Sequence, residues 1–112
     1  SAARYFQPDA LAEVAVSVEI GGKRIVGRID RLVVTPTEIA LIDFKSDASP
    51  PAPGDPRPEA YLAQLAAYRA ALEGIYPNRR VRAEILWTAA PRVDEIESSF
   101  LDSALAALVD AV

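Results

Sequence analysis

Two apolar runs on either side of a proline turn constrain the fold of this chain more than any other stretch. The first run contains Gly27-Arg28-Ile29-Asp30-Arg31 and the second contains Ile42-Asp43-Phe44-Lys45. Between them stands Thr35-Pro36-Thr37-Glu38, and proline presets a turn while lacking the N–H that a sheet ladder needs. The two runs are therefore predicted to form an antiparallel hairpin.

Each run of this hairpin carries an acid where a buried strand normally has none. A turn centred within Pro36-Thr37 pairs residues whose numbers sum to 73, which places Asp30 opposite Asp43. Opposed Cβ atoms lie about 4.5–5.5 Å apart, and like charges at that separation are destabilising unless something neutralises them. Side chains two apart share one strand face, so Lys45 is expected beside Asp43. A divalent cation between the carboxylates would neutralise them.

A further strand is expected before this hairpin. Apolar and polar residues alternate from Leu11 to Ile20, the period of a strand with one buried face. Gly21-Gly22 then predicts a two-residue turn, because glycine tolerates the positive φ that such turns require. Pairs summing to 43 place Glu13 opposite Asp30, so Glu13, Asp30 and Asp43 are expected in one row as candidate metal ligands. An exposed glutamate near a strand start would equally need no functional explanation.

The next segment predicts a loop and then a helix. Residues 46–58 contain five prolines, which favours a mobile loop bordering the acids. Apolar residues recur at helical spacing from Glu59 to Gly74, and Gly74 is placed to end the helix. Gln64 and Tyr68 are four residues apart and therefore share one helix face. They could also be the polar edge and the core aromatic of an ordinary amphipathic helix.

The remaining pattern completes an α/β fold. Val81 to Trp87 alternates again as a strand, so the helix links two strands by a crossover, which implies a parallel pair. A short edge strand is expected within residues 88–96, followed by a final helix beginning at Ser98 or Ser99. The predicted fold class is α/β: a mixed sheet of antiparallel hairpins plus a helical crossover to a further strand, flanked by helices.

The composition limits the chemistry of any metal site. With neither cysteine nor histidine among 112 residues, a metal must be bound through oxygen, which favours magnesium, manganese or calcium over zinc or copper. The net charge of −4 argues against broad nonspecific attraction to nucleic acid. No signal peptide or membrane span is expected, which favours the cytoplasm. The absence of methionine, even at position 1, predicts a piece of a longer polypeptide.

Three motifs in order resemble a known nuclease family. The set Gly27-x-Ile29-Asp30-Arg31, Ile42-Asp43-Phe44-Lys45 and Gln64-x-x-x-Tyr68 resembles the RecB-like branch of the PD-(D/E)XK phosphodiesterases. Within that branch it is most similar to the C-terminal nuclease domains of AddA helicase-nucleases of double-strand-break repair. The similarity extends from Leu11 to Trp87. Asp-x-Lys alone occurs by chance in many proteins, whereas three motifs in this order are specific.

The resemblance assigns roles to the residues of the strand motifs. It implies that Asp30 and Asp43 are metal ligands, that the main-chain carbonyl of Phe44 is a further ligand, and that Lys45 serves the attacking water. The implied metal is Mg²⁺, with Mn²⁺ as a substitute. Phosphodiester hydrolysis needs a Lewis acid, an activated water and neutralisation of developing charge, and these residue types supply them.

The helical motif and the family context imply further roles. Gln64 and Tyr68 would border the site and help to position lysine, water or DNA, and Arg31 could contact a phosphate or pair with a nearby acid. The implied activity is that of a DNA exonuclease in recombinational repair, fed by a helicase motor. The implied partners are DNA and a second nuclease subunit of the AddB type, in the bacterial cytoplasm.

The chain departs from the family in its upstream part. Family members carry an upstream helical region, often with a histidine at the metal site, and this chain has no histidine. We therefore expect residues 1–112 to be a single nuclease domain fragment of a larger protein, folded but weakly active or inactive alone. The alternative is a non-catalytic module that binds DNA or a partner subunit, in which Asp30 and Asp43 pair with Arg28, Arg31 or Lys45.

Overall fold

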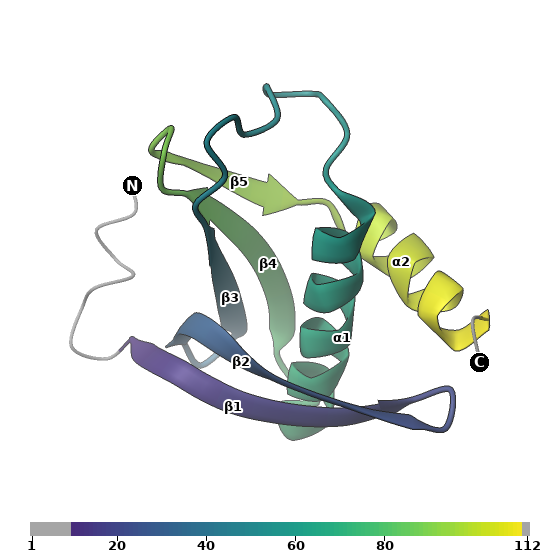
Figure 1. The fold of residues 1–112 in the computed structure, drawn as a ribbon. Helices are drawn as coiled ribbons and strands as arrows, with labels where there is room; N and C mark the ends of the chain where they lie inside the picture. The colour runs from purple at the N-terminus through teal and green to yellow at the C-terminus, as the bar shows by residue number, and fades with distance from the viewer. Residues whose placement is uncertain (1–9, 111–112) are drawn as a thin grey trace.

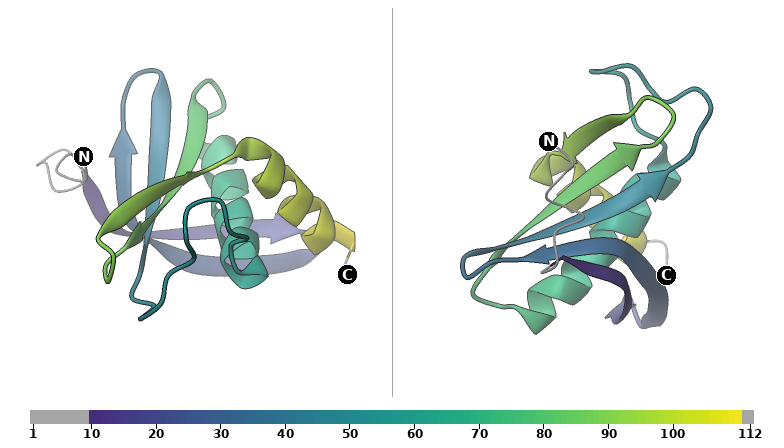
Figure 2. Two further views of the ribbon diagram at one scale, coloured as in Figure 1. Left: turned by 90° about the horizontal axis from the view of Figure 1, so that it is seen from above. Right: turned by 90° about the vertical axis from the view of Figure 1, so that its left-hand side faces the viewer.

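The computed structural model describes residues 10–110 and contains one five-stranded sheet with two helices (Figures 1 and 2). The strand order is β1-β2-β3-β4-β5, and only β3 and β4 are parallel. α1 connects these two strands, so the predicted helical crossover in a mixed α/β sheet is confirmed. The elements in chain order are β1 Leu11–Ile20, β2 Lys23–Val34, β3 Glu38–Lys45, α1 Glu59–Ile75, β4 Arg80–Trp87, β5 Arg92–Ile96 and α2 Ser98–Asp110.

The main core lies between the sheet and α1. Figure 1 shows α1 across one face of the sheet, with the β1–β2 hairpin curving beneath it and α2 packed beside it. Leu65 and Leu72 of α1 meet Leu41, Ile85 and Trp87 of the sheet, and each of these side chains is at most 1% exposed. Burial of this apolar stripe is the dominant stabilising term for the domain.

Both predicted hairpin registers are confirmed. β2 and β3 pair with residue numbers that sum to 73, as in Arg31↔Ile42. β1 and β2 pair with numbers that sum to 43, as in Val14↔Ile29. The turn positions predicted both registers, and the apolar pattern supports them, because a one-residue slip would move every apolar side chain to the wrong face.

The sheet turns a corner at the point where the three acids were expected in a row. Ile29 and Leu32 both lie in the core against α1, although residues three apart in a flat strand face opposite ways. On the neighbouring strand Glu13 has a φ of 52°, and the ladder has partners on both sides of it but none at it. β1 and β2 therefore bend together here and wrap around α1.

The corner removes Glu13 from the acid row. Its side chain is exposed, and the described residues contain no group of three or more His, Cys, Asp or Glu side chains that could hold a metal ion. The expected row of Glu13, Asp30 and Asp43 does not form. The prediction assumed a flat sheet, whereas bending of the strands around the helix turns the glutamate outward.

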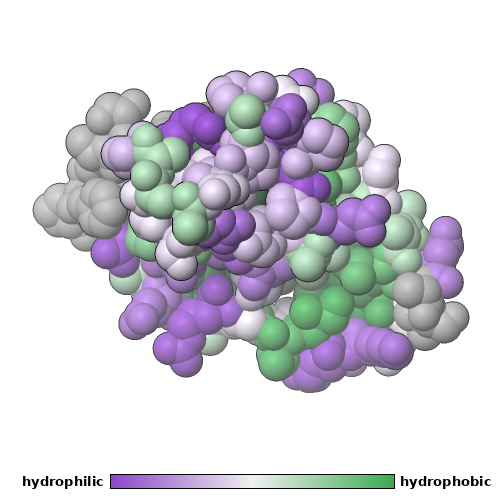
Figure 3. Space-filling model, turned by 45° about the horizontal axis from the view of Figure 1, so that its top comes forward, coloured by the Kyte–Doolittle hydropathy of each residue, from purple (hydrophilic) through white to green (hydrophobic). Residues whose placement is uncertain are grey.

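One face of the molecule is largely hydrophilic. Figure 3 shows hydrophilic side chains over much of one face, with apolar side chains gathered at the lower right. The opposite face of the sheet carries a smaller apolar cluster of Ala40, Ile42 and Leu86. Among residues 10–110 neither helix is long and apolar enough to cross a membrane.

Candidate active site

The carboxylates of Asp30 and Asp43 meet at the bend of β2 and the end of β3. Asp30 Oδ2 accepts a hydrogen bond from the Phe44 N–H at 2.7 Å, which fixes its carboxylate beside β3. Asp43 is 5% exposed. Burial raises the pKa of Asp43 from 3.8 to about 6; the charge and contact of Lys45 oppose this shift, and the neighbouring Asp30 adds to it. The two carboxylates are thus neighbours in the structure, although the β2–β3 ladder partners end at Arg31↔Ile42, one position before the predicted pair.

Lys45 lies against Asp43, as their spacing on one strand face predicts. Its Nζ is 2.7 Å from Asp43 Oδ2, and its side chain is only 17% exposed. The same Nζ donates to Gln64 Oε1 of α1 at 3.0 Å. The structure therefore brings the lysine of the strand motif and the glutamine of the helical motif into direct contact.

Tyr68 completes the helical side of the site. Its hydroxyl accepts a hydrogen bond from Gln64 Nε2 at 3.2 Å and another from the Arg28 N–H of β2 at 3.3 Å. The ring lies so close to Gly27 that a Cβ there would be 2.6 Å from Tyr68 Cε1. Gly27 is thus needed for close approach, a role that its sequence motif alone did not disclose.

The sequence analysis missed two members of this cluster, Tyr61 and Asp47. The Tyr61 hydroxyl donates to Asp47 Oδ1 at 2.8 Å and Oδ2 at 3.0 Å. That hydrogen bond is the largest cause of a raised pKa for Tyr61, since the carboxylate favours the protonated phenol. Helical spacing offered a signal, because Tyr61 stands one turn before Gln64 and therefore on the same side of α1.

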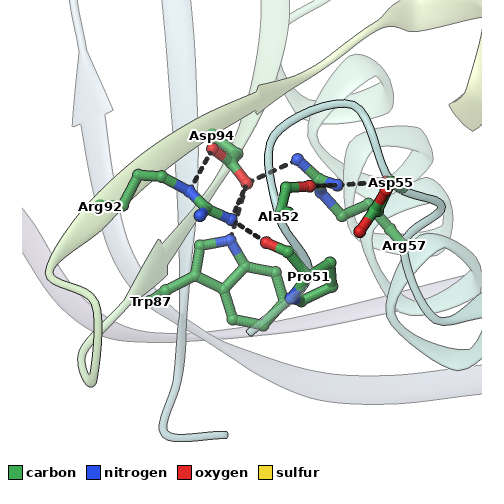
Figure 4. Close-up of polar contacts among 7 residues, drawn as sticks. All are labelled: Pro51, Ala52, Asp55, Arg57, Trp87, Arg92 and Asp94. Atoms are coloured by element: carbon green, nitrogen blue, oxygen red, sulfur yellow. Dashed lines mark hydrogen bonds and ion pairs between the residues drawn. The ribbon is translucent and has the colours of Figure 1, made fainter. Parts of the chain in front are cut away.

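The loop that follows Lys45 is tied to β5 (Figure 4). Arg57 donates to Asp94 Oδ2 at 2.7 Å and to the carbonyls of Asp55 and Ala52, the latter at 3.5 Å. Arg92 also pairs with Asp94 and donates to the Pro51 carbonyl. This proline-rich segment was predicted as a mobile loop, and in the structure these contacts fasten its residues 51–57 to β5.

Arg31 and Phe44 are two further residues to which the sequence analysis assigned a role in the site. The guanidinium of Arg31 lies 6.0 Å from the Phe44 ring, in the position of a cation–π contact. Arg31 pairs across the ladder with Ile42, whose side chain belongs to the small cluster on the sheet face away from α1. The Phe44 carbonyl stays a predicted ligand, while the Phe44 N–H is occupied by Asp30.

The donor set fits an oxygen-bound divalent cation. Asp43 Oδ2 is buried and, apart from its ion pair with Lys45, has no hydrogen-bond donor in bonding geometry. Beside it stands a second carboxylate, that of Asp30. Mg²⁺ is characteristically held by one or two carboxylates and completes its shell with water and substrate phosphate. Two adjacent acids, one of them buried against the Lys45 ammonium, are suitable for such an ion.

Comparison with known proteins identifies a family and a fold. A family model described as the PD-(D/E)XK nuclease superfamily matches residues 2–106. No curated protein matches this chain. A solved structure named "Putative exonuclease", from Eubacterium rectale, is similar over 96% of this chain with a TM-score of 0.65 and 15% sequence identity. The chain covers 43% of that structure.

A second solved structure, of SSO0001, is similar over 91% of this chain and 50% of its own, with a TM-score of 0.49 and 20% identity. At such low identities a structural likeness shows the fold alone. The Eubacterium rectale structure therefore agrees with the sheet topology and helix positions described above.

Proposed function

The chain belongs to the PD-(D/E)XK nuclease superfamily, and on that premise we propose that it is the exonuclease module of an AddA-type helicase-nuclease. In this proposal residues 1–112 form one nuclease domain that hydrolyses phosphodiester bonds of DNA during double-strand-break processing. The metal is Mg²⁺, which Mn²⁺ can replace. The intact protein works in the bacterial cytoplasm beside a second nuclease subunit of the AddB type.

The observation that carries this proposal is the contact of Lys45 with both Asp43 and Gln64. Nζ lies 2.7 Å from the Asp43 carboxylate and 3.0 Å from the Gln64 amide oxygen. Asp43 and Lys45 come from one motif and Gln64 from another, 19 residues farther along the chain. A chance Asp-x-Lys pair on a strand would not require a glutamine from the covering helix.

The residues divide the work of phosphodiester hydrolysis. Asp30 and Asp43 would hold the metal, which when bound supplies a Lewis acid to a phosphoryl oxygen and makes its water more acidic. The Lys45 ammonium would orient the attacking water and stabilise negative charge that develops at phosphorus. Gln64 fixes the ammonium through its amide oxygen, and Tyr68 fixes Gln64 in turn.

The decisive experiment measures nucleotide release from linear DNA by the intact protein, with Mg²⁺ and with EDTA. We expect cleavage only with Mg²⁺ or Mn²⁺, and its complete loss in Asp43→Ala. Glu73→Ala, which changes an exposed acid of α1, is the matched control and should keep the wild-type rate. A folded Asp43→Ala protein that still cuts would exclude this site. DNA binding without cleavage at any metal concentration would favour the non-catalytic module.

A companion experiment separates the lysine from the ligands. Lys45→Ala should retain metal affinity in calorimetry and lose turnover, because an ammonium is not a metal ligand. Residues 1–112 alone should be folded and nearly inactive, since the site offers two carboxylates and the net charge of −4 opposes capture of DNA. If residues 1–112 alone digested DNA at the rate of the intact protein, the expectation that this chain is nearly inactive would be wrong.

A further inference from the structure

Lys45 has a third neighbour that lies outside the motif assignments. Its Nζ is 4.3 Å from the centroid of the Tyr61 ring, within the range of a cation–π interaction. Asp43, Gln64 and Tyr61 thus surround the ammonium with a carboxylate, an amide and an aromatic face. The carboxylate and the amide oxygen accept hydrogen bonds from the ammonium, whereas the aromatic face does not.

That difference matters because an ammonium has three N–H donors. Asp43 and Gln64 lie within hydrogen-bonding distance of Nζ and can take two of them. The ring attracts the positive charge through its quadrupole and needs no donor in return. Tyr61 can therefore hold Nζ in place while one N–H remains for a water or a phosphate oxygen.

The Tyr61 ring is itself held from two sides. At its outer end the hydroxyl donates to both oxygens of Asp47, two residues after Lys45. Along its side the ring lies 6.1 Å from the Trp87 ring, at an interplanar angle of 45°. Trp87 is fully buried and its indole N–H donates to Asp94 at 2.8 Å. The ring thus has a fixed place in which to receive the ammonium.

We propose that Tyr61 is a positioning residue for Lys45, with Asp47 as the anchor of its hydroxyl. The aromatic face keeps the flexible lysine side chain at the acids in the geometry that the attacking water requires. The expected effect of Tyr61 on kcat rests on the proposed nuclease function. The contact itself is testable without any activity.

The first test reads the contact by NMR. An ammonium above an aromatic face places its neighbouring methylene protons in the shielding region of the ring, so the Lys45 Hε resonances should be shifted upfield. The chain has only one other lysine, Lys23, which is exposed beside the Gly21-Gly22 turn and serves as the internal reference. The shift should disappear in Tyr61→Leu and persist in Tyr61→Phe. Lys45 resonances equal to those of Lys23 in the wild type would refute the contact.

The second test measures turnover of the intact protein on DNA at saturating Mg²⁺. Tyr61→Leu should lower kcat by about tenfold or more while KM for DNA changes less than about threefold, because the ring acts on the chemical step. Tyr61→Phe keeps the ring and should restore most of kcat. A merely structural role would change kcat and KM together or change neither. Wild-type kcat in folded Tyr61→Leu would overturn the proposal.

Two further variants keep this test decisive. Tyr76→Leu is the matched control, because Tyr76 also has a cation over its ring, Arg79 at 5.1 Å, but lies at the far end of α1. It should leave kcat unchanged. Asp47→Ala tests the anchor even if Tyr61→Leu fails to fold, and should lower kcat below the wild-type value. Wild-type kcat in Asp47→Ala would refute the anchor. A wild-type protein that cuts no DNA would refute the nuclease proposal, and the NMR result would still decide the contact.

Discussion

Replacing Gly27 with alanine should destabilise the fold and disorganise the site in one step. The side chain of alanine would place a Cβ 2.6 Å from Cε1 and 2.7 Å from Cζ of Tyr68, closer than real Cβ atoms approach other heavy atoms. The positive-φ glycines among the described residues are Gly21, Gly22 and Gly54. Gly27 therefore has a backbone conformation that alanine accepts, and the predicted effect comes from the clash alone.

The size of the effect follows from what must move. Overpacking a fitted core costs about 1–3 kcal/mol. Displacement of the Tyr68 ring also strains its hydrogen bonds from Gln64 and from the Arg28 N–H, worth about 0.5–1.5 kcal/mol each. Alanine returns about 0.4–1 kcal/mol by restricting the unfolded chain. We expect a net loss of about 2 kcal/mol in the free energy of unfolding.

Urea unfolding of three variants tests this reasoning. Gly74→Ala is the control, because nothing lies within 4 Å of a Cβ built there on α1, and it should stabilise the protein by about 0.4–1 kcal/mol. In a Tyr68→Leu background the clashing ring atoms are gone, so Gly27→Ala should cost less than about 0.5 kcal/mol. An equal cost of Gly27→Ala in both backgrounds would refute the steric explanation.

Three other perturbations have defined outcomes. In metal-free protein Asp43→Asn should be more stable than the wild type at pH 8. The pKa of Asp43 in the folded protein is raised to about 6, so the wild type loses stability as pH rises through that value. The difference in stability between the two proteins should therefore close as pH falls from 6 to 4. Equal urea stabilities at pH 8 would contradict this. Mg²⁺ should raise the Tm of the wild type and not that of Asp30→Asn, with EDTA reversing the rise; a rise in both would place the ion elsewhere. Asp94→Ala should cost about 1–3 kcal/mol in urea unfolding, because it leaves Arg57, Arg92 and the Trp87 N–H without their acceptor. Burial opposes the shift, but bonds from Arg92 and Trp87 hold the pKa of Asp94 below its ordinary value, so this contribution should fade as pH falls below about 4. A cost that persists unchanged at low pH would show that the charge of Asp94 is not its source.

Much of the fold was predictable because its rules are local. Gly21-Gly22 and the turn at Pro36-Thr37 determined both hairpin registers, and helical periodicity placed α1 between β3 and β4. The same registers put Asp30 and Asp43 together, and strand alternation put Lys45 beside Asp43. These relations depend only on residue spacing along neighbouring segments, which the sequence contains directly.

The tertiary structure decided what lies across segments that are distant in sequence. Bending of β1 and β2 around α1 turned Glu13 outward, a result of packing that no turn or period encodes. The approach of Tyr68 to Gly27 spans 41 positions by residue number, and the contact of Lys45 with Tyr61 depends on where the loop returns the chain to the sheet. The sequence by itself therefore determined the acids, the lysine and their strands. Packing of the helix against a curved sheet determined the contacts that the sequence did not predict, those of Tyr61 with Lys45 and of Tyr68 with Gly27.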